Sequence, residues 1–237
     1  MKQRLDHALV ARGIVTSRSQ AESWVRLKKV TVNGQPAKKS GQMVVDSDDI
    51  KLNAKEQYVG RAGLKLASVA QTLGLQFKDT IVLDVGSSTG GFTDYALQHD
   101  AKKVYAVDVG TEQLHPSLRG DKRIELYEKT DIRDFIPDQT PDIVVMDVSF
   151  ISLREILPHI ARISEPRTQV VAMLKPQFEA GKQQVNKGII KNDSVRRQIL
   201  KDFEMWAKRY FIIVDKADSE VAGTKGNRER FYLLKPL

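Results

Sequence analysis

After residue 60 the sequence alternates short apolar runs with segments of helical periodicity, and this alternation constrains the fold more than any other feature. The apolar runs have the length of buried strands and lie at Ile81–Val85, Lys103–Val107, Ile124–Tyr127, Ile143–Asp147 and Gln169–Leu174. The helical patterns lie at Arg61–Leu73, Phe92–Gln98, Leu153–Ala161 and Ser194–Tyr210. Apolar strands that alternate with helices are typical of an α/β sheet covered on both faces.

Two further apolar runs lie near the end of the chain, at Phe211–Asp215 and Phe231–Leu234. The polar loop between them contains glycine and has no helical pattern, so it predicts an antiparallel pair. The α/β sheet should therefore end in antiparallel strands.

Residues 1–53 follow a different pattern, with two short helices followed by short strands. The first helical pattern begins at Leu5 and stops at Gly13, and Ser17–Gln20 has the form of a capping box that begins the second. We expect a small α+β domain over residues 1–53, a polar linker over residues 54–59 and the larger domain over residues 60–237.

Positive charge is concentrated in this N-terminal segment. Residues 1–45 contain nine Lys and Arg against two acidic side chains, a net charge of +7. The other 192 residues contain 29 basic and 28 acidic side chains, a net charge of +1. Such a segment suits a polyanion, although charge attracts any phosphate and small domains can be basic without a ligand.

The absence of certain residues and segments narrows the function further. The chain has no cysteine, which excludes disulfides and thiolate metal sites and favours the cytoplasm. Its N-terminus does not resemble a signal peptide, and its longest apolar runs are far shorter than the roughly 20 residues of a membrane-spanning helix. The four histidines are scattered, so we expect no metal site.

A glycine-rich loop follows the first strand of the larger domain and is the strongest local signal for a ligand. It runs from Asp84 to Phe92 with the spacing G-x-x-x-G-G, and about 20 residues later a second strand ends in Asp108. A carboxylate at that position can accept hydrogen bonds from ribose hydroxyls. Because a P-loop is absent, a nucleoside without a pyrophosphate fits best, which indicates S-adenosylmethionine. The alternative is a tight turn that binds nothing.

Two later strands also end in charged residues. Asp147 ends the fourth strand and Lys175 follows the fifth, so both should lie beside the cofactor crevice. The alternative is a surface salt bridge. Asp131, after the third strand, could meet an adenine edge. The expected cofactor contacts are Asp84, Gly86, Ser87, Ser88, Gly90, Gly91, Phe92, Asp108, Asp131 and Asp147.

Several motifs together resemble a known family. Arg4-Leu5-Asp6, Gly13, Ser17-Arg18 and Val30–Gly34 resemble the S4 RNA-binding domain. Six segments of the larger domain resemble the TlyA (haemolysin A) family of FtsJ-like ribosomal RNA methyltransferases. They are Tyr58–Leu66, the Asp84 loop, Tyr105–Gly110, Asp147–Leu153, Leu174–Glu179 and Gly226–Phe231. The resemblance covers nearly the whole chain. It implies a Rossmann-like methyltransferase sheet, ribosomal RNA or a ribosomal subunit as partner, and methylation of a cytidine ribose 2′-hydroxyl.

The resemblance also implies a catalytic tetrad and a set of RNA contacts. The tetrad would be Lys65, Asp147, Lys175 and Glu229, with Lys175 as the base that removes the hydroxyl proton. The expected RNA contacts are Arg4, Arg18, Arg26, Lys28, Lys29 and Asn33. Three alternatives are a non-catalytic RNA-binding protein of ribosome assembly, a pseudouridine synthase and a membrane-active haemolysin. An intact tetrad disfavours the non-catalytic protein, and the Asp84 loop disfavours the pseudouridine synthase. The absence of a membrane-spanning run disfavours the haemolysin.

Overall fold

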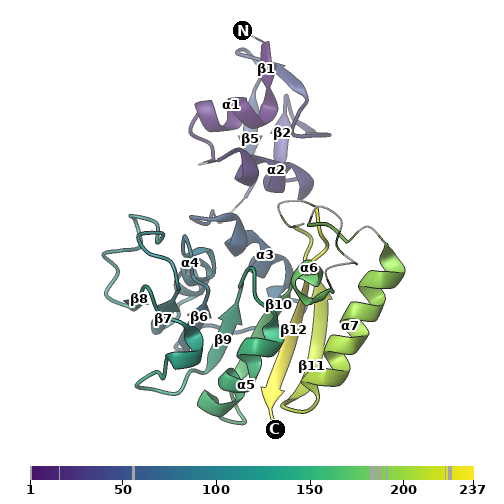
Figure 1. The fold of residues 1–237 in the computed structure, drawn as a ribbon. Coiled ribbons are helices and arrows are strands. Elements are labelled where there is room, and N and C mark those ends of the chain that lie inside the picture. Colours follow the sequence, from purple (N-terminus) through teal and green to yellow (C-terminus); the bar gives the residue numbers. More distant parts are fainter. Residues whose placement is uncertain are drawn as a thin grey trace.

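The larger domain is built around a seven-stranded mixed sheet (Figure 1). The computed structural model describes residues 2–15, 17–54, 57–181, 185, 188–190, 192–221, 223 and 226–237. The strand order is β11-β12-β10-β9-β6-β7-β8. The strands are β6 (Ile81–Val85), β7 (Lys103–Val107), β8 (Ile124–Tyr127), β9 (Ile143–Met146), β10 (Gln169–Leu174), β11 (Phe211–Asp218) and β12 (Arg230–Pro236).

Strands β6 to β10 are parallel, whereas β12 runs antiparallel to both β10 and β11. The predicted α/β sheet with an antiparallel end is therefore confirmed. The chain builds outward from β6 through β7 and β8, then returns to β9 on the other side of β6. The crevice between the carboxyl ends of β6 and β9 is a topological switch point, where open α/β sheets bind ligands.

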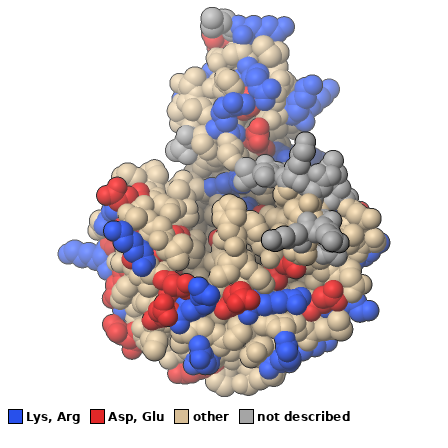
Figure 2. Space-filling view, in the orientation of Figure 1, with Lys and Arg blue, Asp and Glu red and all other residues tan. Residues whose placement is uncertain are grey.

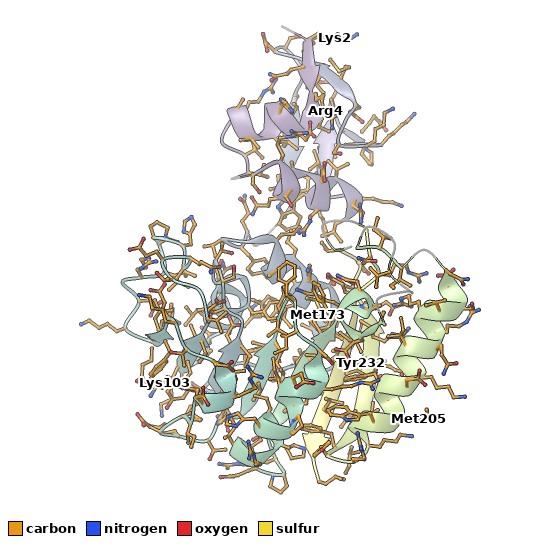
Figure 3. All side chains as sticks on the ribbon, viewed as in Figure 1. Lys2, Arg4, Lys103, Met173, Met205 and Tyr232 are labelled. Carbon is orange, nitrogen blue, oxygen red and sulfur yellow. The ribbon has the colours of Figure 1, made fainter. Side chains whose placement is uncertain are left out.

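Helices cover both faces of the sheet because successive strand residues point to opposite sides. The larger helices are α3 (Arg61–Ala70), α4 (Gly91–Gln98), α5 (Leu153–Ile163) and α7 (Asp193–Ala207); two short ones are η1 (Ile132–Asp134) and α6 (Pro176–Glu179). Helices α3 and α4 share a core with Val145 and Met173. Helices α5 and α7 share the other core with Val144 and Ala172. Figure 3 shows Met173 deep within the larger domain.

The N-terminal segment forms a small α+β unit that lies above the larger domain in Figure 1. Its elements are β1 (Lys2–Arg4), α1 (Leu5–Ala11), α2 (Arg18–Arg26), β2 (Val30–Val32), β3 (Gln35–Pro36), β4 (Met43–Val45) and β5 (Ile50–Leu52). As the capping box predicts, the Ser17 hydroxyl accepts a hydrogen bond from the Gln20 N–H at the start of α2.

The two units share one apolar core. Trp24 of α2 and Tyr58 are each at least 95 % buried in the same cluster as α3 and α4. Gln20 Nε2 donates to the Tyr58 carbonyl at 2.8 Å, and the next residue, Val59, donates its N–H to Asp94 of α4 at 2.7 Å. The connection between the units is therefore packed and hydrogen-bonded on both sides.

Candidate active site

The switch-point crevice begins at the turn that follows β6. Gly86 adopts φ +77°, and a Cβ added there would lie 3.1 Å from the Asp147 carbonyl oxygen. Only glycine takes this conformation without strain while letting the ends of β6 and β9 approach so closely. The turn therefore brings Asp84 and Asp147 to the same crevice.

Asp84 is a buried acid with one free oxygen. Its Oδ2 accepts hydrogen bonds from the Thr93 N–H at 2.9 Å and the Thr93 hydroxyl at 2.6 Å, whereas Oδ1 is buried and has no partner. Burial raises the pKa of Asp84 to about 7, against the opposing effect of the Thr93 hydrogen bonds. A cationic hydrogen-bond donor at the unpartnered Oδ1 would stabilise the ionised form of this buried carboxylate, so we expect a ligand that carries such a donor.

The backbone conformation and close packing of Gly90 and Gly91 shape the remainder of the glycine-rich loop. Gly90 has φ +87°, and Gly91 packs so closely on α3 that an added Cβ would lie 2.8 Å from the Gly63 nitrogen. The Ser87 hydroxyl is buried without a partner, and the Phe92 ring packs on Phe231 beneath the loop. The loop thus presents an unsatisfied polar atom to the crevice.

Asp108 and Asp131 line one end of the crevice, a cavity of about 460 Å³. Asp108 accepts hydrogen bonds from the N–H groups of Ser88 and Gly110, at 2.8 and 2.7 Å. Asp131 pairs with Arg133 at 2.6 Å, and these hydrogen bonds lower the pKa of Asp131 to about 2. Both side chains are therefore anchored, and both have oxygens that can accept further hydrogen bonds.

The four side chains of the implied tetrad lie together at the other end of the crevice. Lys65 of α3 lies between two acids, with its Nζ 2.7 Å from Glu229 Oε2 and 3.8 Å from Asp147 Oδ2. Lys175 Nζ lies 2.5 Å from Asp147 Oδ1 and donates to the Ser149 hydroxyl at 2.7 Å. Two cations and two anions balance one another, as buried charges must.

Sheet topology explains how residues 164 positions apart meet. Asp147 follows β9 and Lys175 follows β10, and these parallel strands end at the same edge. Because β12 is antiparallel to β10, Leu174 pairs with Arg230, which places Glu229 at that edge too. The tetrad lines a cavity of about 500 Å³ that shares Gly86, Ser88, Asp147, Ser149 and Phe150 with the cavity at Asp108.

Comparison with known sequences identifies the family. The sequence model described as "FtsJ-like methyltransferase" matches residues 58–235, three quarters of the chain. The chain belongs to the FtsJ-like methyltransferase family. A second model, "S4 domain", matches residues 3–50, so the small unit is an S4 domain.

Individual relatives agree with this assignment. The 23S rRNA (cytidine-2′-O)-methyltransferase TlyA of Campylobacter jejuni is 34% identical, over 94% of this chain and 96% of its own. Hemolysin A of Brachyspira hyodysenteriae is 39% identical, over 95% and 97%. A solved structure of a candidate hemolysin from Streptococcus thermophilus is 39% identical with a TM-score of 0.75, over 99% and 88%.

In this FtsJ-like chain the S4 domain presents most of its basic side chains to solvent. Figure 2 shows many blue and few red spheres on it, whereas the larger domain has mixed charge. Arg4 and Arg18 both bond to the buried Asp6 carboxylate, at 2.8 and 3.3 Å, and Figure 3 shows Arg4 far from the sheet.

The other expected RNA contacts of the S4 domain divide into two kinds. Arg26, Lys28 and Lys29 are exposed at the end of α2. Asn33 differs, because its amide bonds to Asp48 and to the Asp49 N–H within a turn. Its side chain is therefore occupied by the protein itself.

The FtsJ-like site also contains side chains to which the sequence assigned no role. Ser149 binds Lys175, and Gln177 and Phe178 of α6 line the tetrad cavity. Phe150 is 91% exposed with φ +65°, and its ring lies 5.2 Å from that of Phe178. An exposed aromatic residue in strained backbone is a signal of function that only the structure reveals.

Within the described ranges, no helix is both long and apolar enough to cross a membrane. The same residues contain no group of three or more His, Asp or Glu side chains arranged to hold a metal ion.

Proposed function

We propose that this chain transfers a methyl group from S-adenosylmethionine to the ribose 2′-hydroxyl of a cytidine in ribosomal RNA. The observation that carries the proposal is the tetrad of Lys65, Asp147, Lys175 and Glu229 beside the glycine-rich loop. The Campylobacter relative is named as a cytidine-2′-O-methyltransferase, which supports cytidine as the target, and the S4 domain supports an RNA substrate.

The residues of the crevice fit the proposed cofactor. The free oxygen of Asp84 and the unpartnered Ser87 hydroxyl suit an amino-acid end, and the Asp108 and Asp131 carboxylates suit a nucleoside. When bound, S-adenosylmethionine supplies a methyl group on a sulfonium, an electrophile that needs no further activation.

The protein must then position the hydroxyl and take its proton. Positioning alone can contribute roughly 7–11 kcal/mol to catalysis, and a base typically contributes about 10²–10⁴-fold in rate. The 2′-hydroxyl would give its proton to the base as its oxygen bonds to the methyl carbon, and the methyl–sulfur bond of the cofactor would break at the same time to leave S-adenosylhomocysteine. The base must be neutral at that moment and must lie beside the hydroxyl.

The contacts of the two buried lysines favour Lys175 as the base. Lys65 lies between two carboxylates, those of Glu229 and Asp147, which hold its ammonium group in position. Lys175 contacts one carboxylate and one neutral hydroxyl, Ser149, so it has fewer anionic partners than Lys65. Asp147 touches both lysines and orients the pair.

We also propose the cytoplasm as the place of action and ribosomal RNA or a ribosomal subunit as the partner, with no membrane and no metal involved. The experiment incubates the pure protein with labelled S-adenosylmethionine and ribosomal RNA from cells that lack it, then maps 2′-O-methyl groups. Label on one or a few cytidines is the expected result. Cofactor binding without transfer to any ribosomal RNA would instead favour the non-catalytic RNA-binding protein.

A further inference from the structure

Gln177 is a polar side chain of the tetrad cavity to which no role has yet been assigned. The tetrad and the cofactor loop account for most of the polar wall, and the Ser149 hydroxyl already accepts from Lys175. The Asn227 amide is fully used, because its oxygen accepts from the Ile190 N–H and its nitrogen donates to the Gly188 carbonyl. Gln177 remains, and its Oε1 is buried with no hydrogen-bond partner in the described structure.

Gln177 lines the same cavity as Lys175. It is two residues after Lys175, in the first turn of α6, and the next residue, Phe178, pairs its ring with the exposed Phe150. A nucleotide whose 2′-hydroxyl reaches Lys175 must bring its base into the same cavity, because the base is attached to the adjacent ribose carbon. The base would then meet aromatic rings and one amide.

We propose that Gln177 determines the specificity for cytosine by accepting a hydrogen bond from the exocyclic amino group of the base. This inference rests on the proposed methyl transfer to cytidine. Cytosine presents an amino donor beside the N3 acceptor, and an amide presents an acceptor beside a donor, so the two edges are complementary. The buried Oε1 gains the donor that it lacks in the protein alone.

Uracil is disfavoured at the same position. Its O4 is an acceptor and would face Oε1, another acceptor. Turning the amide over would bury an NH₂ group whose two protons both need acceptors, and O4 satisfies only one of them. A well-formed pairing of this kind discriminates between bases by about 10- to 100-fold.

The test combines a protein substitution with a change of one base. The target cytidine, mapped as above, is replaced in ribosomal RNA by an analogue that carries hydrogen instead of the amino group. Methyl transfer to both RNAs is measured with the wild type, with Gln177→Ala and with a control, Gln198→Ala, whose side chain bonds to Asp202 on α7. Cofactor affinity of each variant reports whether the site is intact.

The wild type and Gln198→Ala should favour cytidine over the analogue by about 10- to 100-fold. Gln177→Ala should methylate both RNAs at the same reduced rate, with unchanged cofactor affinity. If Gln177→Ala still distinguishes the RNAs as strongly as the wild type, the inference is wrong while the proposed function stands. A wild type that methylates both RNAs equally overturns it without any variant, and a wild type that methylates no ribosomal RNA overturns the proposed function as well.

Discussion

Asp84 offers the sharpest physical test of the cofactor site, because its ionisation is opposed by burial. It is 1% exposed, and its pKa is raised to about 7 from an ordinary value of 3.8. Each pH unit corresponds to 1.36 kcal/mol, so a difference of about three units corresponds to about 4 kcal/mol. The perturbation is Asp84→Asn, which keeps an oxygen for Thr93 and removes the titration.

The direction in which pH changes the folding stability depends on how many protons the folded and the unfolded protein bind. Between pH 4 and 7 the folded protein keeps a proton on Asp84 that the unfolded chain has released, so folding stability falls as the pH rises and levels off above pH 7. Urea denaturation of the cofactor-free protein at pH 4, 5, 6, 7 and 8 measures this. The stability of the wild type relative to Asp84→Asn should fall by about 4 kcal/mol across the series.

Binding of the cofactor should offset the loss of stability that accompanies ionisation of Asp84, since a cationic donor at the free Oδ1 stabilises the ionised form. Affinity for S-adenosylmethionine, measured by calorimetry, should therefore rise between pH 5 and 7 in the wild type and stay weak and flat in Asp84→Asn. Stability curves that run parallel for the two proteins at every pH would refute the reasoning, because they would show that Asp84 does not titrate in this window.

Three further predictions concern the base, the RNA and the loop. Lys175→Ala should lower methyl transfer by at least about 10²-fold while cofactor and RNA binding persist; undiminished turnover would remove Lys175 as the base. Arg18→Ala should weaken ribosomal RNA binding and reduce the slope of log affinity against log salt concentration by about one, whereas Lys201→Ala on α7 should change neither quantity. Equal slopes for the two variants would contradict this prediction. Gly90→Ala should destabilise the protein by about 1–2 kcal/mol, since φ is +87° and the new Cβ would lie 2.6 Å from Leu114 and Leu118; an unchanged melting temperature would argue against the loop conformation.

The ends of the buried strands were predictable from the sequence because a buried strand has a clear apolar pattern. Parallel strands also end at the same edge of the sheet. Asp147 and Lys175 directly follow such strands, and Asp84 lies one residue before the end of β6, so their common edge follows from the alternation of strands and helices. Lys65 and Glu229 were not predictable in this way. Their places depend on how α3 packs and on the antiparallel register of β12, and only the family resemblance indicated them beforehand.

Short elements escaped the sequence pattern. Helix α6 has four residues, too few to show helical periodicity, yet it places Gln177 and Phe178 in the tetrad cavity. Phe150 has an apolar side chain that a pattern assigns to the core, whereas the backbone at φ +65° turns it outward. Such side chains are set by local backbone geometry, which composition and spacing do not encode.

The segment that joins the two domains is packed against both of them. Within the predicted linker, residues 54–59, Tyr58 is 3% exposed and its backbone carbonyl accepts a hydrogen bond from Gln20 of the S4 domain. Its neighbour Val59 bonds to Asp94 in α4, the helix that begins in the glycine-rich loop. Removing the S4 domain would therefore uncover an apolar surface and release a hydrogen-bond partner of Tyr58, next to the residue that bonds to α4. Substitutions of single exposed arginines separate RNA binding from cofactor binding more cleanly than any truncation, because they leave this shared core intact.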